Sequence, residues 1–209
     1  MGRYLGPKCK LCRREGTKLF LKGARCYSKK CSLERKSYPP GQKSRRYRSK
    51  QSDYAIHLRE KQKTKRMYGL LEKQFKNFFK KAEDFPGVTG ENLLRLLETR
   101  LDNVIFRMGF APSRNAARHL INHGHILVDG KKVDIPSYVV SEEQTIEINK
   151  KSRQIPIIQE AMEAHKSLDQ FGWLEVQSDN FKGVVKSLPG EEQLPQDIDV
   201  RLIVEFYSK

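Results

Sequence analysis

Residues 93–133 read LLRLLETRLDNVIFRMGFAPSRNAARHLINHGHILVDGKKV, and their pattern changes from a helical period to a hairpin signal. Apolar residues recur every three or four positions over 93–108, which predicts a helix ended by a glycine. A second helix is predicted over 112–123, opened by Pro-Ser and again ended by a glycine. Over 125–133, Asp-Gly stands between two apolar runs, the strongest short signal for a β-hairpin. We expect a helix-turn-helix-like pair followed by a bent antiparallel sheet, within an α+β fold.

The flanking sequence predicts further helices and strands. Before this stretch, Ser52 suits the cap of a helix that runs to about Tyr68, and an apolar stripe predicts another helix over 71–82. After it, strands are expected around 138–140 and 145–148, and Pro156 suits the first turn of a helix. The segments WLEV, FKGVVK and RLIVEFYSK near the C-terminus read as short strands. We expect four divisions. They are an N-terminal module (1–42), a linker with a helical domain (43–92), the helix-pair-and-sheet module (93–155), and a C-terminal helix with strands (156–209).

The four cysteines of the chain form two short-spaced pairs, Cys9 with Cys12 and Cys26 with Cys31. This spacing is typical of a structural zinc site, in which four thiolates hold one ion and leave no open position for a reacting water. We expect a hairpin between the pairs. Disulfides would use the same residues, but a reducing cytosol disfavours them. An iron–sulfur cluster takes the same four ligands and remains the alternative.

Positive charge is concentrated in the N-terminal quarter of the chain. Residues 1–50 hold 17 of the 41 Lys and Arg and only two of the 25 acids, whereas residues 51–209 hold 24 basic and 23 acidic residues. Such a surface favours a polyanionic partner. A structural metal contributes on the order of 10 kcal/mol of folding free energy. A short module crowded with like charges needs such a contribution, because it buries little apolar surface.

Several function classes find no support in the sequence. There is no apolar run long enough to span a membrane and no apolar core of a secretion signal near the N-terminus, so we expect a cytoplasmic protein. The chain carries no P-loop, no GxSxG and no dinucleotide-binding glycine run, so we expect neither a small-molecule substrate nor catalysis. His123 and His125 lie close together but are interpreted as surface or packing residues rather than metal ligands.

Long segments of the chain resemble one family from end to end. GRYLGPKCKLCRREGTKLFLKG, ERKSYPPGQ, SDYAIHLREKQK, YGLLEKQF, GENLLRLLETRLDNVIFRMGF, GHILVDGKKVDIPSY and LIVEFYSK occur in this order. They are similar to the bacterial small-subunit ribosomal protein S-four family, in its zinc-bearing four-cysteine branch. The segment over 97–138 also resembles the small RNA-binding module named after that family.

The resemblance implies a function in the small (30S) ribosomal subunit. Proteins of this kind bind the 5′ domain of 16S rRNA directly and nucleate assembly of the subunit body. They also contact ribosomal protein S-five, at an interface that affects decoding accuracy, and they line the mRNA entry channel. The resemblance implies the channel role for the basic residues of the linker, Lys43, Arg45, Arg46, Arg48 and Lys50.

Basic side chains in three further places are candidates for contacts with RNA phosphates. In the module they are Arg3, Lys8, Lys10, Arg13, Arg14, Lys18, Lys22, Arg25, Lys29, Lys30, Arg35 and Lys36. On the helix after Ser52 they are Arg59, Lys61, Lys63, Lys65 and Arg66. In the helix-pair-and-sheet module they are Arg114 and Arg118, four apart and expected on the outer face of their helix, and Lys131 and Lys132 at the hairpin tip.

Two other functions were considered. An RNA-modifying enzyme carrying the same RNA-binding module would need a catalytic domain, and the residues outside that module are accounted for by the other divisions. A zinc-containing DNA-binding regulator would place SRNAARHLINH in a major groove, but it usually needs a dimer, and the sequence has no dimerisation stripe. Recognition of folded RNA by shape and phosphates fits basic groups spread along one chain better.

Overall fold

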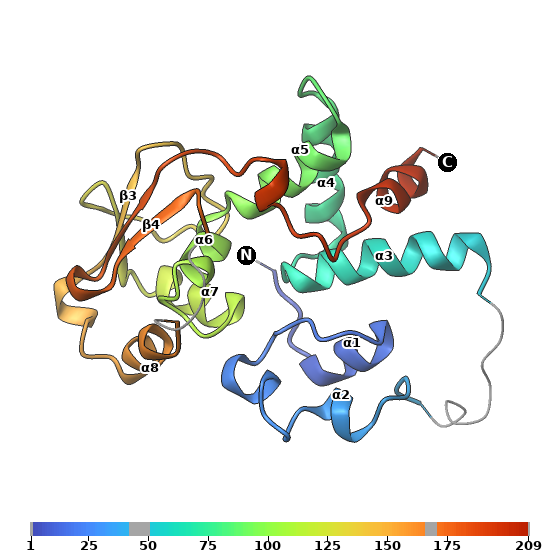
Figure 1. Ribbon diagram of the computed structural model, residues 1–209, viewed down its shortest axis with the longest axis horizontal. Helices are drawn as coiled ribbons and strands as arrows, with labels where there is room; N and C mark the ends of the chain where they lie inside the picture. The colour runs from blue at the N-terminus through green and yellow to red at the C-terminus, as the bar shows by residue number, and fades with distance from the viewer. Residues whose placement is uncertain (1, 42–50, 166–170, 209) are drawn as a thin grey trace. The chain divides into compact units, whose positions relative to one another are not determined.

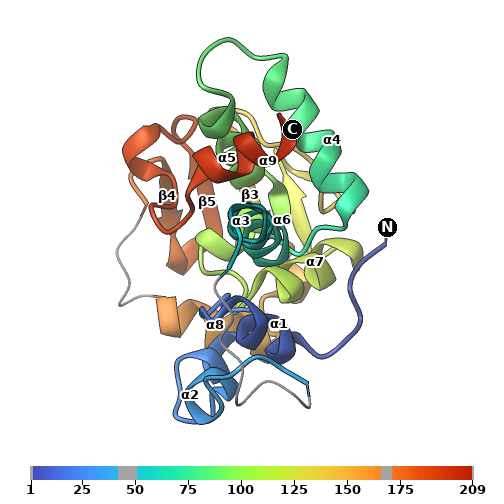
Figure 2. The ribbon, with the colours of Figure 1, turned by 90° about the vertical axis from the view of Figure 1, so that its right-hand side faces the viewer.

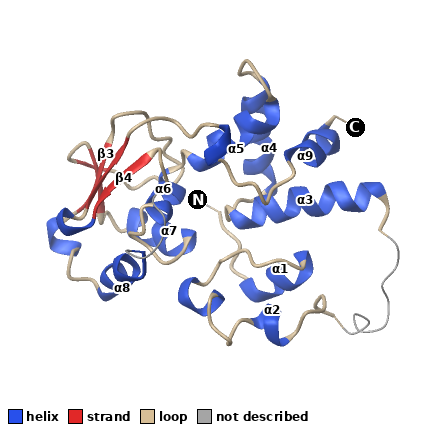
Figure 3. Ribbon diagram, viewed as in Figure 1, coloured by secondary structure: helices blue, strands red, loops and turns tan. Residues whose placement is uncertain are grey.

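The computed structural model of the protein describes residues 2–41, 51–165 and 171–208 (Figure 1). The chain divides into two compact units, one joining Met1–Leu93 to Pro195–Lys209 and the other formed by Leu94–Leu194. Among the described residues, the first unit is helical and every strand lies in the second (Figure 3). The two units therefore build their cores from different elements, and each is described by itself.

The N-terminal module of the first unit contains three short helices: α1 (Lys8–Glu15), the 3₁₀ helix η1 (Gly23–Cys26) and α2 (Ser32–Arg35). α1 ends at Gly16, whose φ of 74° is the left-handed conformation that favours glycine. Leu19 and Leu21 are buried and supply most of the module's small apolar interior. The expectation of a hairpin between the cysteine pairs was wrong, because turns and η1 occupy that place in the described chain.

Three longer helices follow: α3 (Asp53–Met67), α4 (Glu72–Glu83) and α5 (Thr89–Glu98). The Ser52 hydroxyl accepts a hydrogen bond from the Ala55 N–H at 3.3 Å, which confirms the predicted cap of α3. Phe75, Phe79 and Ala82 are buried on one side of α4, which confirms the predicted apolar stripe. α3 and α4 lie in the first unit, whereas α5 begins in the first unit and ends in the second, with the boundary after Leu93.

The last helix, α9 (Val200–Tyr207), was predicted as a strand, and that prediction was wrong. Asp199 caps it, because its carboxylate accepts a hydrogen bond from the Arg201 N–H at 3.0 Å. α9 packs against α3, and both views show the two helices side by side (Figures 1 and 2). The ring of Tyr207 also stacks on Phe79 of α4, with centroids 4.4 Å apart. These contacts need a helical face, which outweighs the strand propensity of the sequence.

The second unit combines three helices with a five-stranded antiparallel sheet of order β2-β1-β3-β5-β4. Its helices are α6 (Leu101–Arg107), α7 (Arg114–Asn122) and α8 (Pro156–His165). Its strands are β1 (Ile126–Val128), β2 (Lys131–Lys132), β3 (Thr145–Ile148), β4 (Leu174–Gln177) and β5 (Lys182–Val185). The α+β class is confirmed, and so are the strands predicted from WLEV and FKGVVK.

The predicted hairpin is formed by β1 and β2. Val128 pairs with Lys131, and the two residues between them, Asp129 and Gly130, have φ values of 49° and 73°. Two consecutive positive φ values mark a type I′ turn, whose twist matches that of the flanking strands. The Asp-Gly signal therefore predicted both the hairpin and its turn.

The continuous helix predicted over 93–108 was wrong, because α5 and α6 are separated at Thr99 and Arg100. The Thr99 hydroxyl donates to the Arg95 carbonyl at 2.9 Å, and Arg100 adopts an extended backbone with φ −69° and ψ 138°. Arg100 makes an isolated β-bridge with Val139. In the described chain, this bridge takes the place of the strand predicted around 138–140.

The core of the second unit fills the space between its helices and one face of the sheet. Val104 and Ile105 of α6, Ile121 of α7, Ile146 of β3 and Trp173 before β4 are fully buried members of one cluster. At about 25 cal/mol per Å² of apolar surface, this burial is the main source of the unit's stability. It fixes the hairpin and the ends of α6 and α7 as a rigid platform.

Candidate metal centre and nucleic-acid interface

The four cysteines come from three elements of the N-terminal module. Cys9 and Cys12 lie one turn apart on α1, Cys26 ends η1, and Cys31 is the N-cap of α2. All four side chains line one cavity of about 20 Å³, which has room for one water-sized occupant. The basic residues Lys22 and Arg25 line the same cavity.

The electrostatics of this cavity disfavour bare thiolates. Burial raises the pKa of the Cys12 and Cys26 thiols, and the negative charges of the neighbouring sulfurs raise them further. The Lys22 N–H opposes this at Cys26, since it donates a hydrogen bond to the Cys26 sulfur at 3.4 Å. All four cysteines are free thiols. Among the residues that the structure describes, no three or more His, Cys, Asp or Glu side chains are arranged to hold a metal ion.

Most cations of the module point to solvent without acids to neutralise them. Of its two acids, Glu34 pairs with Lys18 at 2.5 Å, and Glu15 pairs with α3. Arg13 is half-buried and donates to the Tyr38 carbonyl at 3.0 Å, and Lys8 lies over the Tyr4 ring. Nine others are exposed and form no ion pair within the described ranges: Arg3, Lys10, Arg14, Lys22, Arg25, Lys29, Lys30, Arg35 and Lys36.

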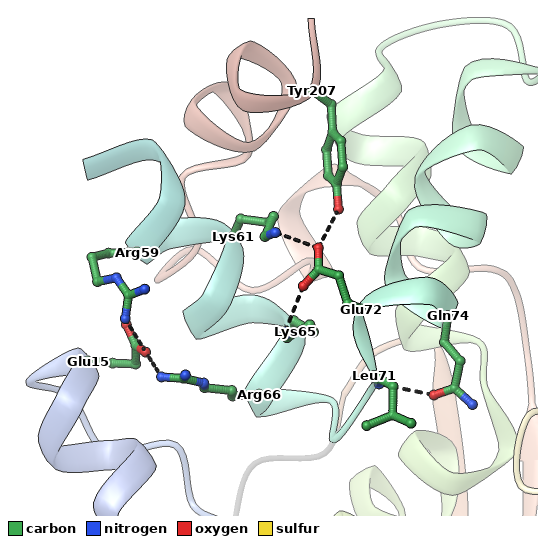
Figure 4. A network of polar contacts seen from close by, with 9 residues as sticks. All are labelled: Glu15, Arg59, Lys61, Lys65, Arg66, Leu71, Glu72, Gln74 and Tyr207. Carbon is green, nitrogen blue, oxygen red and sulfur yellow. Dashed lines mark hydrogen bonds and ion pairs between the residues drawn. The ribbon is translucent and has the colours of Figure 1, made fainter. Parts of the chain in front are cut away.

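The five cations predicted as a phosphate-binding face of α3 are all paired with acids of the protein, but three carboxylates are shared among them, so two positive charges remain in excess. Arg59 and Arg66 both pair with Glu15 of α1, whose side chain is buried (Figure 4). Burial raises the pKa of the Glu15 carboxyl in spite of the two guanidinium groups, and burial lowers the pKa of Arg59. Lys63 pairs with Glu60 at 3.0 Å.

The two remaining lysines of α3 pair with Glu72 at the start of α4 (Figure 4). Lys61 lies 2.5 Å and Lys65 2.7 Å from the Glu72 carboxylate, and the Tyr207 hydroxyl donates to it at 3.4 Å. Burial opposes ionisation of Glu72, but the two lysines lower its pKa below the ordinary value. The Lys61 ammonium also lies 4.6 Å from the ring centre of Phe206. The basic run of α3 therefore holds α1, α4 and α9 together.

Arg114 and Arg118 do not share an exposed outer face, so that expectation was wrong. Both are buried, because acids and amides of α6 face them. Arg114 donates to the Asn103 carbonyl oxygen at 2.7 Å, and Arg118 lies 3.6 Å from the Asp102 carboxylate. Asp102 is itself held by two hydrogen bonds from Arg100, at 3.0 and 2.7 Å. These arginines form a polar interior between α6 and α7.

The hairpin lysines lie as expected, since Lys131 and Lys132 are exposed on β2. The predicted entry-channel residues of the linker, Lys43, Arg45, Arg46, Arg48 and Lys50, lie outside the described residues.

Three histidines gather where α7 meets the hairpin, and the sequence pointed to only two of them, His123 and His125. The His119 and His123 rings are nearly parallel, with an interplanar angle of 4° and centroids 5.3 Å apart. His125 continues the series, 6.1 Å from His123. The spacing of His119 and His123, four residues apart on a predicted helix, was the signal that could have found the pair.

Two protein-family models together match residues 3–146 of the 209-residue chain. Residues 3–98 match the family described as "Ribosomal protein S4/S9 N-terminal domain", and residues 99–146 match the "S4 domain". The chain belongs to the ribosomal protein S4 family. Members of this family are structural proteins rather than enzymes.

Curated relatives align with the chain from end to end. The protein from Natranaerobius thermophilus is 52% identical over 209 residues, and that from Halothermothrix orenii is 53% identical over 209 residues. The protein from Geotalea daltonii is 54% identical over 211 residues, and in all three pairs the alignment covers 100% of both chains. Each is named "Small ribosomal subunit protein uS4".

The S4-domain match falls on α6, α7, β1, β2 and the first half of β3. The helix pair and hairpin predicted from sequence are therefore the elements of an S4 domain. None of the helices in the described residues has the length and apolarity that would let it cross a membrane.

Proposed function

We propose that this protein is a structural constituent of the small ribosomal subunit that binds 16S rRNA directly. The observation that carries the proposal is its similarity, at 52–54% identity over complete chains, to proteins named for that subunit. The nine exposed cations of the N-terminal module supply a physical mechanism for binding RNA. Lys and Arg side chains without acidic neighbours are free to neutralise RNA phosphates.

The binding is proposed to target the 5′ domain of 16S rRNA and to nucleate assembly of the subunit body. A competition experiment tests this. Labelled 5′-domain RNA bound to the protein is challenged with unlabelled 5′-domain RNA, large-subunit rRNA and duplex DNA at physiological salt. We expect only the 5′-domain RNA to compete well. Equal competition by all three nucleic acids would show that the protein binds them by non-specific electrostatic attraction, and it would overturn the proposal.

We also propose that the four cysteines hold one structural Zn²⁺. The support is that the four cysteines, from three elements, line a single cavity that also has two basic residues in its lining. Their side chains are not arranged as a metal-holding group in the described residues, so binding of the ion would have to draw the sulfurs together. Zinc bound there would supply folding free energy and no open coordination position. The chain's own contribution is to hold Cys9 and Cys12 on one helix, and to donate the Lys22 N–H to the Cys26 sulfur.

Metal analysis of the purified protein tests the zinc proposal. We expect one zinc per chain, release of zinc by a chelator, and loss of amide protection over residues 2–41, with protection retained over residues 101–148. The Cys26→Ser variant should lose the metal and the same protection. Iron with inorganic sulfide and a visible absorption band would identify a cluster instead of zinc. Unchanged protection of residues 2–41 after metal removal would contradict a structural role.

Two further partners follow from family membership and are proposed with it. One is ribosomal protein S-five, through an interface that affects decoding accuracy. The other is mRNA at the entry channel, contacted by the five basic linker residues at positions 43, 45, 46, 48 and 50. Subunits reconstituted with alanine at these five positions should translate structured mRNA more slowly than unstructured mRNA. Equal slowing of both messages would remove the linker from the entry channel.

A further inference from the structure

The three histidines form an ordered series that is anchored at one end, here called the imidazole ladder (His119, His123 and His125). At the inner end, Nδ1 of His125 lies 2.8 Å from the Ser152 hydroxyl. The His125 carbonyl also accepts a hydrogen bond from the Asn149 N–H at 2.8 Å. His123 and His119 are exposed, so the ladder runs outward from an anchored ring to an exposed one.

The geometry of the ladder is that of an aromatic stack. Centroid separations of 5.3 and 6.1 Å lie in the range of offset-stacked rings. His119 and His123 are fixed relative to each other by their places on α7, and His125 is fixed by its strand and by Ser152. A flat ring held in this way loses little conformational entropy when another ring stacks on it.

Lysines of two elements lie beside the ladder. The Lys132 side chain lies directly over Gly124, between His123 and His125 in sequence, so a Cβ at that position would collide with it. Lys150 and Lys151 are exposed on the 3₁₀ helix η2 (Lys150–Ser152), which His125 contacts through Ser152. These lysines supply positive charge for the phosphates of a bound strand.

Nearby acids are engaged elsewhere and do not neutralise these lysines. The Asp129 carboxylate accepts a hydrogen bond from the Thr145 N–H at 2.8 Å. Glu147 of β3 lies 3.5 Å from the Lys182 ammonium of β5. A surface with exposed aromatic rings and flanking lysines matches an RNA nucleotide, whose base stacks and whose phosphates are anionic.

We propose that the imidazole ladder is a subsite for an unpaired RNA nucleobase, which stacks on His119 while Lys132, Lys150 and Lys151 bind phosphates further along the same strand. The proposal rests on the proposed rRNA-binding function and specifies a place and a chemistry within it. Stacking without hydrogen bonds to base edges tolerates every base, so the subsite reads the presence of an unpaired base rather than its identity.

The test uses the full-length protein and two six-nucleotide probes, oligoadenylate and its abasic analogue with the same phosphates. We expect the wild-type protein to bind oligoadenylate at least about fivefold more tightly, because stacking on an aromatic residue is worth roughly 1–3 kcal/mol per base. His119→Ala should abolish this preference, whereas His119→Phe should retain it, because the ring is kept and the ionisable group is lost. Asn122→Ala, an exposed change at the end of the same helix, is the matched control.

Each outcome bears on the proposal. A preference that disappears in His119→Ala and persists in His119→Phe and Asn122→Ala supports it, as does an upfield shift of ring protons on binding oligoadenylate only. No preference in the wild type, or the same preference in His119→Ala, overturns it. The rRNA competition described above is scored separately in the wild type. A protein that passes that competition but shows no base preference would retain the proposed function without this subsite.

Discussion

Glu15 and Arg59 are separated by 44 positions in the chain, yet Nη1 of Arg59 donates to Oε1 of Glu15 at 3.3 Å. Arg66, two turns further along α3, donates to the same oxygen. The other carboxylate oxygen, Oε2, is buried and has no hydrogen-bond partner among the described residues. This carboxylate joins the cysteine-bearing module to α3, and the joint is electrostatic rather than apolar.

Glu15→Gln should weaken this joint. Two guanidinium groups would lose their carboxylate, although water can solvate them in part because they are about a quarter exposed. We expect the free energy of unfolding to fall by only about 1 kcal/mol, because the burial that raises the pKa of Glu15 offsets part of the roughly 1.5–3 kcal/mol typical of hydrogen bonds to charged groups. Chemical denaturation, with amide exchange over residues 8–35, measures this.

The matched control is Glu34→Gln, which removes the carboxylate of an ion pair at the surface of the same module. This substitution should cause no resolvable change in the free energy of unfolding, because exposed ion pairs contribute little to stability. Equal effects of the two substitutions would show that Glu15 is no more than a surface charge.

Asp102→Asn should destabilise the second unit strongly. Asp102 is 1% exposed and compensates Arg100, also 1% exposed, while Arg118 lies 3.6 Å away. Removing one partner of a buried ion pair costs about 3–5 kcal/mol. Urea denaturation measures the loss, with the exposed Asp134→Asn as control. A loss below about 1 kcal/mol would mean that water reaches these arginines readily.

Glu72→Gln should be more harmful than Lys61→Met. The first leaves a buried ammonium without its carboxylate, whereas the second removes that charge and keeps an unbranched apolar chain. Because Glu72 is about half exposed, we expect a loss of only about 1 kcal/mol for Glu72→Gln. Urea denaturation of both variants measures this difference, and a greater loss for Lys61→Met would contradict the prediction.

Ionisation of the Tyr207 phenol provides a second test of the contacts of Glu72. Burial and the Glu72 carboxylate both raise the pKa of its phenol. In Glu72→Gln the phenol should ionise at lower pH than in the wild type, and a spectrophotometric titration follows this. An unchanged titration would contradict the hydrogen bond between the two side chains.

Stability should depend on pH through His125. Burial lowers the pKa of His125, and the positive charges of His123 and Lys132 lower it further. The folded state therefore binds this proton less readily than the unfolded state, and the stabilisation is present above the ordinary histidine pKa of about 6.5. It is lost as the pH falls through that value. We expect His125→Asn to be less sensitive than the wild type to a change from about pH 7.5 to 5.5, as measured by thermal unfolding.

Local signals in the sequence predicted much of the fold. Ser52, Ser113 and the apolar stripe of α4 specify their helices through caps and periodicity, which act over a few residues. The hairpin at Asp129 and Gly130 is specified by backbone conformations that few other residue pairs adopt. The four cysteines line one cavity, and the zinc site predicted from their spacing stays a prediction.

The features that could not be predicted from the sequence depend on contacts between residues far apart in the chain. The basic run of α3 has the pattern of a solvent-exposed surface, and only the position of Glu15 shows that two of its arginines share a buried carboxylate. Arg118 lies four positions from Arg114, but Asp102 of another helix draws it inward. The sequence of α9 is rich in β-branched and aromatic residues and favours a strand, and its partners on α3 and α4 decide otherwise.

The composition of the first unit from two separate chain segments has a consequence for synthesis. The Asp199 N–H donates to Glu60 across 139 positions, so α3 receives its α9 contacts only after the whole second unit has been translated. The second unit is continuous in sequence and can fold as soon as it leaves the ribosome that makes it. The first unit, although its synthesis begins first, can therefore be completed no earlier than the second. Until α9 arrives, a nascent chain exposes one side of α3, the period in which a chaperone has most to protect.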